Sequence, residues 1–126
     1  MTHSCLDIVF PSVHGRDVLC CFDGGDLTSD AGLALVALAD SKLGLTESMV
    51  EAVCDRRQQS KVKHSVLDIL RERIYAIAAG YEDANDLDTL GNDPALKTAC
   101  DRLPVSGLPL ASQPTISRLE NAIGRL

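Results

Sequence analysis

The stretch SVLDILRERIYAIAAGY, residues 65–81, decides the predicted fold of this 126-residue chain. Its apolar residues recur at three- and four-residue spacing, which places them on one face of an α-helix. Ser65 stands directly before the pattern as an N-cap, and Arg71 and Arg73 fall outside the apolar face. We therefore predict a helix that buries Val66, Ile69, Leu70, Ile74, Ile77 and Tyr81.

Helical patterns flank this stretch on both sides. Residues 30–44 are apolar on nearly every side, which is typical of a helix in the centre of a core, and Gly44 is expected to end that helix. Thr46 then offers an N-cap for a short second helix. Further along, Asp93 followed by Pro94 predicts a helix start, because a capping acid and a proline at the first helical position are both favourable.

Two short apolar runs near the start of the chain predict a β-hairpin. LDIVF, residues 6–10, and DVLCCF, residues 17–22, flank the turn-forming segment PSVHGR. We expect one mainly α-helical domain over residues 1–126, with a β-hairpin followed by about five or six packed helices. Its predicted parts are the hairpin at 1–25, a helical body at 28–103 and a C-terminal helix at 112–126.

The composition favours packed helices over a β-sandwich. Apolar residues make up 45% of the chain and charged residues 24%, which is typical of a globular protein, whereas aromatic residues are only 3%. The sequence shows neither the pattern of a signal peptide nor an apolar run long enough to span a bilayer. Five cysteines without paired metal-ligand spacing predict buried thiols in a reducing cytosol.

The positive charge is concentrated in one segment of an acidic chain. The formal net charge is −6, yet residues 55–73 hold six of the 12 Lys and Arg residues and only three acids. A basic stripe of this kind marks where a polyanion docks, although a solvated loop and helix edge has the same composition. Both interpretations stay open on charge alone.

The segment GYEDANDLDTLGNDP, residues 80–94, holds five carboxylates and no Lys or Arg. Carboxylates that bind two metal ions converge from separate elements, whereas these five are local in sequence. The EF-hand spacing is absent, and Asp93 is already explained as a helix cap. We favour a structural connector over a metal site and predict no catalytic or metal-binding residue.

The segment SQPTISRLENAI, residues 112–123, predicts a last helix with Ser112 as its cap. Ser117, Arg118 and Asn121 are the kind of donors that a groove-reading helix presents to DNA. An ordinary amphipathic helix, with Ile116, Leu119 and Ile123 as its apolar stripe, explains the same pattern.

Four motifs in order make the chain resemble a known family. FDGG at 22–25, DRR at 55–57, GYEDAND at 80–86 and SQPTISRLEN at 112–121 are similar to the N-terminal region of bacterial DDE insertion-sequence transposases, the group 1 branch. The resemblance implies a role in DNA transposition. In this family three carboxylates on a ribonuclease-H-like fold bind two Mg²⁺ ions, and that core follows the stretch matched by residues 117–121.

The resemblance therefore implies that the catalytic core lies outside this chain. We expect the chain alone to be catalytically inactive and to need no cofactor, Mg²⁺ belonging to the missing core. The resemblance also implies that the acidic segment 80–94 is a structural signature of the family. Its signature residues in this chain are Tyr81, Asp83, Asn85 and Asp86. The expected location is the cytoplasm of a bacterium, on the nucleoid.

The expected partner is DNA at the inverted-repeat ends of a mobile element, with an intact transposase or a second copy of the chain as a further partner. The residues expected to contact DNA are Arg56, Arg57, Lys61, Lys63, His64, Arg71, Arg73, Arg118 and Asn121. Two alternatives remain. One is a protein-interaction module that docks through exposed Ile116, Leu119, Ile123 and Leu126, and the other is a remnant without function.

Overall fold

The computed structural model describes residues 11–17 and 27–123. The described residues are mainly α-helical, as predicted, and contain six α-helices and two short 3₁₀ helices. In chain order the elements are α1 (Leu33–Leu43), α2 (Leu45–Glu51), η1 (Gln59–Lys61), α3 (Val66–Ala78), η2 (Ala84–Asp86), α4 (Leu87–Leu90), α5 (Pro94–Ala99) and α6 (Gln113–Ile123).

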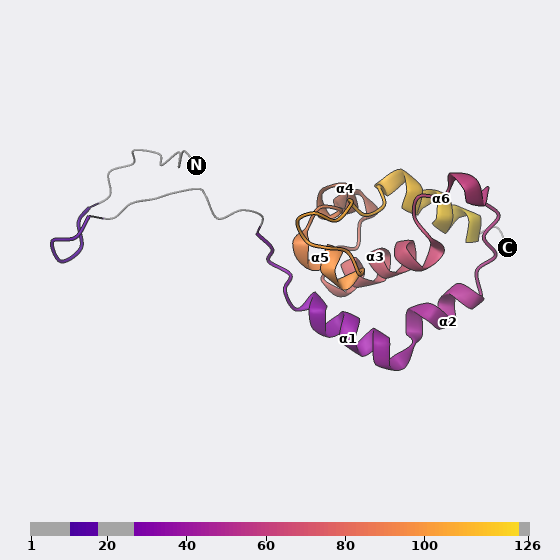
Figure 1. Cartoon of the computed structure of the whole chain (residues 1–126), viewed down its shortest axis with the longest axis horizontal. Helices are drawn as coiled ribbons and strands as arrows, with labels where there is room; N and C mark the ends of the chain where they lie inside the picture. Colours follow the sequence, from indigo (N-terminus) through magenta and orange to yellow (C-terminus); the bar gives the residue numbers. More distant parts are fainter. Residues whose placement is uncertain (1–10, 18–26, 124–126) are drawn as a thin grey trace.

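Helix α3 lies at the centre of the helical body, in contact with α1, α2 and α5 (Figure 1). The expectation that the helix within residues 30–44 is central is wrong, because only Leu33 and Asp40 of α1 are buried. The predicted cap of α3 is confirmed, because the Ser65 hydroxyl accepts a hydrogen bond from the Asp68 N–H at 3.1 Å. Ile69 is buried as expected, but Ile77 is 47% exposed. Tyr75 is buried instead. The packing of α3 against several helices turns its buried face away from Ile77.

The core is built mainly from aliphatic side chains, as the low aromatic content predicts. Its buried members are Leu33, Val66, Ile69, Tyr75, Ala76, Leu87, Leu96, Cys100, Leu110, Ala111, Ile116 and Leu119. The expectation of buried thiols holds for Cys100, where burial raises the pKa to about 12. It is wrong for Cys54, which is exposed in the connector after α2.

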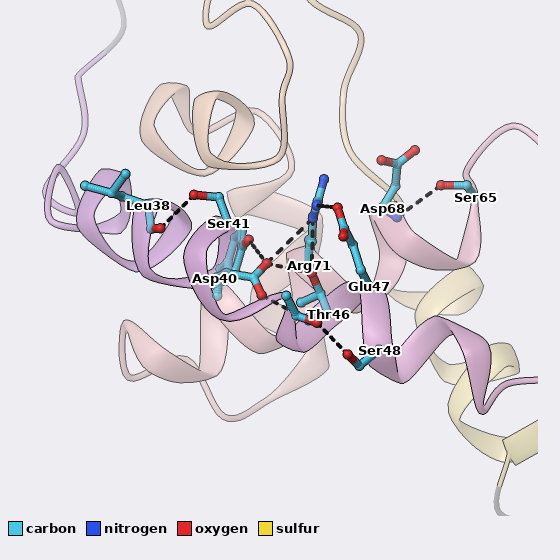
Figure 2. A network of polar contacts seen from close by, with 11 residues as sticks. Leu38, Asp40, Ser41, Thr46, Glu47, Ser48, Ser65, Asp68 and Arg71 are labelled. Atoms are coloured by element: carbon cyan, nitrogen blue, oxygen red, sulfur yellow. Dashed lines mark hydrogen bonds and ion pairs between the residues drawn. The ribbon is translucent and has the colours of Figure 1, made fainter.

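A buried polar cluster holds the corner between α1 and α2 against α3 (Figure 2). Gly44 ends α1, as predicted, with a φ of 64° that favours glycine. Thr46 does not cap α2, because Gly44 occupies that position. The Thr46 side chain turns inward, and its N–H and hydroxyl both donate to the Asp40 carboxylate, at 3.0 and 2.6 Å.

The same carboxylate receives a bond from α3. The Tyr75 hydroxyl donates to Asp40, and the Arg71 guanidinium lies 3.7 Å from it. Burial alone would raise the pKa of Asp40, but these hydrogen bonds outweigh it and lower that pKa below its usual value. The ionised carboxylate therefore links α1, α2 and α3.

The start of α5 follows the sequence prediction. The Asp93 carboxylate accepts from the N–H groups of Ala95 and Leu96, both at 3.0 Å, and Pro94 occupies the first helical position. In the segment that follows α5, a turn brings Gly107 close to the backbone of Leu103. A Cβ at position 107 would lie 2.3 Å from the Leu103 carbonyl oxygen. Only glycine fits this turn.

The predicted hairpin strands lie outside the described residues, apart from Asp17. In the described part between them, residues 11–17, one antiparallel bridge joins Val13 and Arg16 across a turn at His14 and Gly15. No strand is present in residues 11–17 or 27–123, so the structure gives the hairpin no support beyond this turn. Residues 124–126 of the predicted last helix also lie outside the described part.

Candidate nucleic-acid interface

A hollow of about 980 Å³ lies between the connector at residues 54–64 and helix α6. In Figure 1 the connector leaves α2, passes beside α6 and then enters α3. The predicted cations of the connector and the predicted groove-reading helix therefore meet at one place, although about 50 residues separate them in the sequence. We call this hollow the cationic groove; the residues expected to bind DNA that line it are Arg56, Arg57, Lys61, Lys63, His64 and Arg118.

The cationic groove has a charge opposite to that of the chain. Its lining holds five Lys and Arg side chains and one carboxylate, Asp55, a formal net charge of +4 with His64 neutral. The formal net charge of the whole chain is −6, so the residues that do not line the groove carry a net charge of −10. Positive charge is thus gathered where it can attract a polyanion.

Four of these cations are available to a ligand. Arg56, Lys61, Lys63 and Arg118 are exposed, and none of them bonds to another side chain of the described residues. Lys61 ends η1, and Arg118 stands midway along α6. The four face the hollow from two sides, which suits a phosphate chain passing between the connector and α6.

Arg57 and His64 shape the connector. The Arg57 guanidinium donates to Asp55 at 2.8 and 2.9 Å and to the His64 carbonyl oxygen at 2.9 Å. The hydrogen bonds from Arg57 hold the pKa of Asp55 far below its usual range. These bonds close residues 55–64 into a loop.

Arg102 fixes the other side of this loop. Its Nη2 lies 3.1 Å from His64 Nδ1, and its Nη1 donates to the Pro109 carbonyl oxygen at 2.9 Å. Burial and then the charge of Arg102 lower the pKa of His64 below its usual value. Because an arginine only donates, His64 Nδ1 is the acceptor and the neutral ring presents its Nε2–H. His64 can therefore donate one hydrogen bond to a ligand without adding charge.

Arg71, Arg73 and Asn121 lie outside the cationic groove. Arg71 binds Thr46 and lies near Glu47, as Figure 2 shows. Arg73 donates to Glu120 on α6 at 2.7 Å and to the Glu82 carbonyl oxygen at 2.8 Å. These two guanidinium groups have partners within the chain, whereas Asn121 is exposed on α6.

The segment of residues 80–94 makes hydrogen bonds both within itself and to distant parts of the chain. Asp83 accepts from the Asn85 N–H at 2.9 Å, and the Tyr81 hydroxyl donates to Asp30 at 2.8 Å. Asp88 accepts from the N–H of Gln113 at the start of α6, at 2.9 Å. Asp86 precedes α4 without a side-chain cap bond.

The acids of residues 80–94 that make hydrogen bonds each bond to a different part of the backbone. Within residues 11–17 and 27–123, no group of three His, Cys, Asp or Glu side chains is placed to hold a metal ion. Asp83, Asp88 and Asp93 accept hydrogen bonds from different backbone N–H groups, so their carboxylates do not converge on one point as a two-metal site requires.

The alternative docking stripe on α6 is largely covered. Ile116 is fully buried and Leu119 is 7% exposed, because both pack into the core of the chain's own body. Ile123 is half-buried and Leu126 lies outside the described residues. The expectation that Ile116 and Leu119 are exposed for a partner is therefore wrong.

Sequence reasoning missed Asp55 and Arg102 as residues that position the groove, and it assigned Arg57 only to DNA contact. Asp55 and Arg57 are two residues apart outside a helix, and this short polar pairing is visible only as the motif DRR. Arg102 carries no local signal, since His64 is 38 positions away.

Together these features define a class of protein: a mainly helical module with a cationic groove suited to a polyanion. Comparison with protein families matches residues 10–125 to the family described as Transposase DDE domain group 1. The chain belongs to this family, as its motifs predict, and is thereby related to DNA transposition. Comparisons with curated proteins and with solved structures find no match. No helix of the described residues is long and apolar enough to cross a membrane.

Proposed function

We propose that this chain binds DNA in its cationic groove and acts in transposition as a DNA-binding or assembly segment of a DDE transposase. The observation that carries the proposal is the meeting of the basic connector with α6 around one hollow of net charge +4. Membership of the transposase family supports DNA as the polyanion. The proposed DNA is the inverted-repeat end of a mobile element on the bacterial nucleoid.

The proposed phosphate contacts are Arg56, Lys61, Lys63 and Arg118. Arg57 and His64 shape the connector, and His64 adds an uncharged donor. Asn121 lies on α6 three residues beyond Arg118, where it can approach a base edge if the DNA extends past the groove. Arg71 and Arg73 support the body through their ion pairs.

We also propose that the chain contributes binding and not strand cleavage. The carboxylates and Mg²⁺ ions of the reaction would then come from another segment or another chain. The support is that three of the five acids of residues 80–94, namely Asp83, Asp88 and Asp93, accept hydrogen bonds from backbone N–H groups. Incubation of the chain with end DNA and Mg²⁺ should give no cleavage, and cleavage lost on changing Asp83 and Asp86 to Asn would refute this division.

The experiment for DNA binding is a fluorescence anisotropy titration between 50 and 200 mM salt. Four phosphate contacts predict that log K falls with log salt at a slope of about −3.6, because each contact contributes about −0.9. Arg118→Gln should reduce the slope by about 0.9. The matched control is Lys42→Gln, since Lys42 is an exposed cation on α1 away from the groove. Absent binding, or a slope that is insensitive to Arg118, contradicts the proposal.

Assembly with a second copy or an intact transposase is a second proposed role, favoured by the exposed apolar residues of α1 and α2. Leu35 is 71% exposed, Leu38 is 52% exposed and Leu43 is 78% exposed. Large apolar side chains that are left exposed are typical of protein contacts where they form a contiguous patch. Size-exclusion chromatography with light scattering tests this role, and a Leu35→Gln/Leu38→Gln variant should weaken any dimer that persists at 500 mM salt.

A further inference from the structure

The cationic groove has an apolar floor that phosphate binding does not require. Five apolar residues also line the hollow, namely Val62, Leu110, Leu119, Ala122 and Ile123. Leu110 and Leu119 are only 5% and 7% exposed, whereas the four available cations are exposed, so these two leucines form the deeper part of the hollow. Uncharged polar groups are also present, namely Gln58, Ser112 and Thr115. A surface that only touched the outside of a duplex would need the cations alone.

An intact duplex cannot use this floor. B-DNA keeps its bases inside and presents charged phosphates outside, so a duplex lying across the groove would reach only the cationic sides. Pushing phosphates down to the apolar floor would remove water from charged oxygens without replacing it by hydrogen bonds, which is strongly unfavourable.

An unpaired nucleotide matches both parts of the groove. Its base has apolar faces and a polar edge, and its phosphates can remain at the level of the cations. The base faces would contact Val62 and Ala122, while Gln58 and Thr115 supply donors and acceptors for the edge. The volume of about 980 Å³ lies at the upper end of the range for pockets that enclose small organic molecules, and is ample for a base with its sugar.

We infer that the cationic groove receives an unpaired nucleotide at a DNA end, with the base on the apolar floor and its flanking phosphates on the connector and Arg118. The inference rests on the proposed function and narrows its substrate from DNA in general to DNA ends with unpaired nucleotides. The described lining has no aromatic ring to stack on the base, so the preference over a blunt end should be moderate, about fivefold.

The test compares two labelled DNAs that differ only at one end. One is a blunt duplex, and the other is the same duplex with three unpaired nucleotides at its 3′ end. Anisotropy titrations at 100 mM salt should give about fivefold tighter binding to the extended duplex. Ala122→Gln adds a longer side chain at an exposed lining position of α6 and so narrows access to the apolar floor; it should bring the ratio of the two affinities close to one.

The matched control is Ala39→Gln, which makes the same change at an exposed alanine of α1 and should keep the fivefold ratio. Equal affinity of the unchanged protein for the two DNAs would overturn the inference while the proposed function stands. The same conclusion follows if Ala122→Gln lowers both affinities and keeps their ratio. Absence of binding to either DNA would reject the proposed function together with the inference.

Discussion

Glu72 is a buried carboxyl group whose ionisation should destabilise the attachment of α6. It lies on α3 and is 1% exposed. Its Oε2 accepts from the Ala111 N–H at 2.9 Å, just before α6, and its Oε1 is buried without a hydrogen-bond partner among the described residues. Burial raises the pKa of Glu72 from 4.5 to about 8. Near neutral pH the folded protein therefore keeps this group protonated.

The raised pKa gives a definite sign to the pH dependence. Between pH 4.5 and 8 the folded state binds more protons at Glu72 than the unfolded state, so stability falls as the pH rises through this window and levels off above it. From pH 5 to pH 7 the contribution of Glu72 to stability falls by on the order of 2–3 kcal/mol, which corresponds to about 10 °C in Tm for a chain of this size. The lowered pKa of His64 acts in the opposite direction below pH 6.5, so the effect of Glu72 is read from a variant. Asp40 and Asp55 have lowered pKa values, so they lose their stabilising effect only below this window.

The variant Glu72→Gln isolates this effect, because a glutamine resembles the protonated acid in shape and cannot ionise. Thermal unfolding of both proteins at pH 5, 6, 7 and 8 should show their difference in Tm changing in favour of Glu72→Gln as the pH rises. Glu51→Gln, at an exposed acid of α2, is the control and should keep the pH dependence of the unchanged protein. A Tm difference between Glu72→Gln and the unchanged protein that is constant from pH 5 to 8 would refute the reasoning.

Three further predictions concern the groove and the body. Arg102→Gln should lower DNA affinity several-fold and leave the salt slope constant, because Arg102 positions His64 and the segment before α6 without contacting phosphate. Anisotropy titrations measure both the affinity and the slope. A reduced slope would show that Arg102 contacts phosphate directly. Asp40→Asn should reduce the free energy of unfolding by about 2–4 kcal/mol in urea titrations, since it removes the negative charge beside Arg71 and replaces one accepting oxygen by an amide nitrogen, which cannot accept from the Thr46 and Tyr75 hydroxyls. A loss under about 0.5 kcal/mol would contradict that role. Gly107→Ala should cost about 1–3 kcal/mol by the same measurement, because its Cβ would overlap a carbonyl oxygen 2.3 Å away, and unchanged stability would show that the turn relaxes freely.

The sequence predicts those parts of the fold that depend on local pattern. The helix over residues 66–78, its Ser65 cap and the Asp93–Pro94 start of α5 are all encoded within a few neighbouring residues. Thr46 shows where local pattern fails, because its hydroxyl donates to Asp40 at the corner between α1 and α2 instead of capping α2. The prediction that Ile77 is buried is wrong for a similar reason, since helix periodicity does not show which neighbouring helices cover each face of a helix.

The sequence indicates most of the residues that line the candidate site, but it does not show that they lie together in the fold. The basic segment 55–73 stands out by charge, and α6 by its polar donors. Their meeting depends on Arg102 bonding His64 across 38 positions, and on Glu72 and Asp88 holding the segment that leads into α6. These contacts between distant residues leave no periodic signal. The charge pattern alone assigns Arg71 and Arg73 to DNA, but these arginines bond to Thr46 and Glu120 and lie outside the groove.

The central claim is that the connector and α6 form one DNA-binding surface, and the salt dependence of DNA affinity tests it most directly. The unchanged protein should give a slope of about −3.6 between 50 and 200 mM salt, and the double variant Lys63→Gln/Arg118→Gln, with one cation removed from each side of the groove, about −1.8. A slope near zero for the unchanged protein, or equal slopes for the two proteins, would contradict the claim.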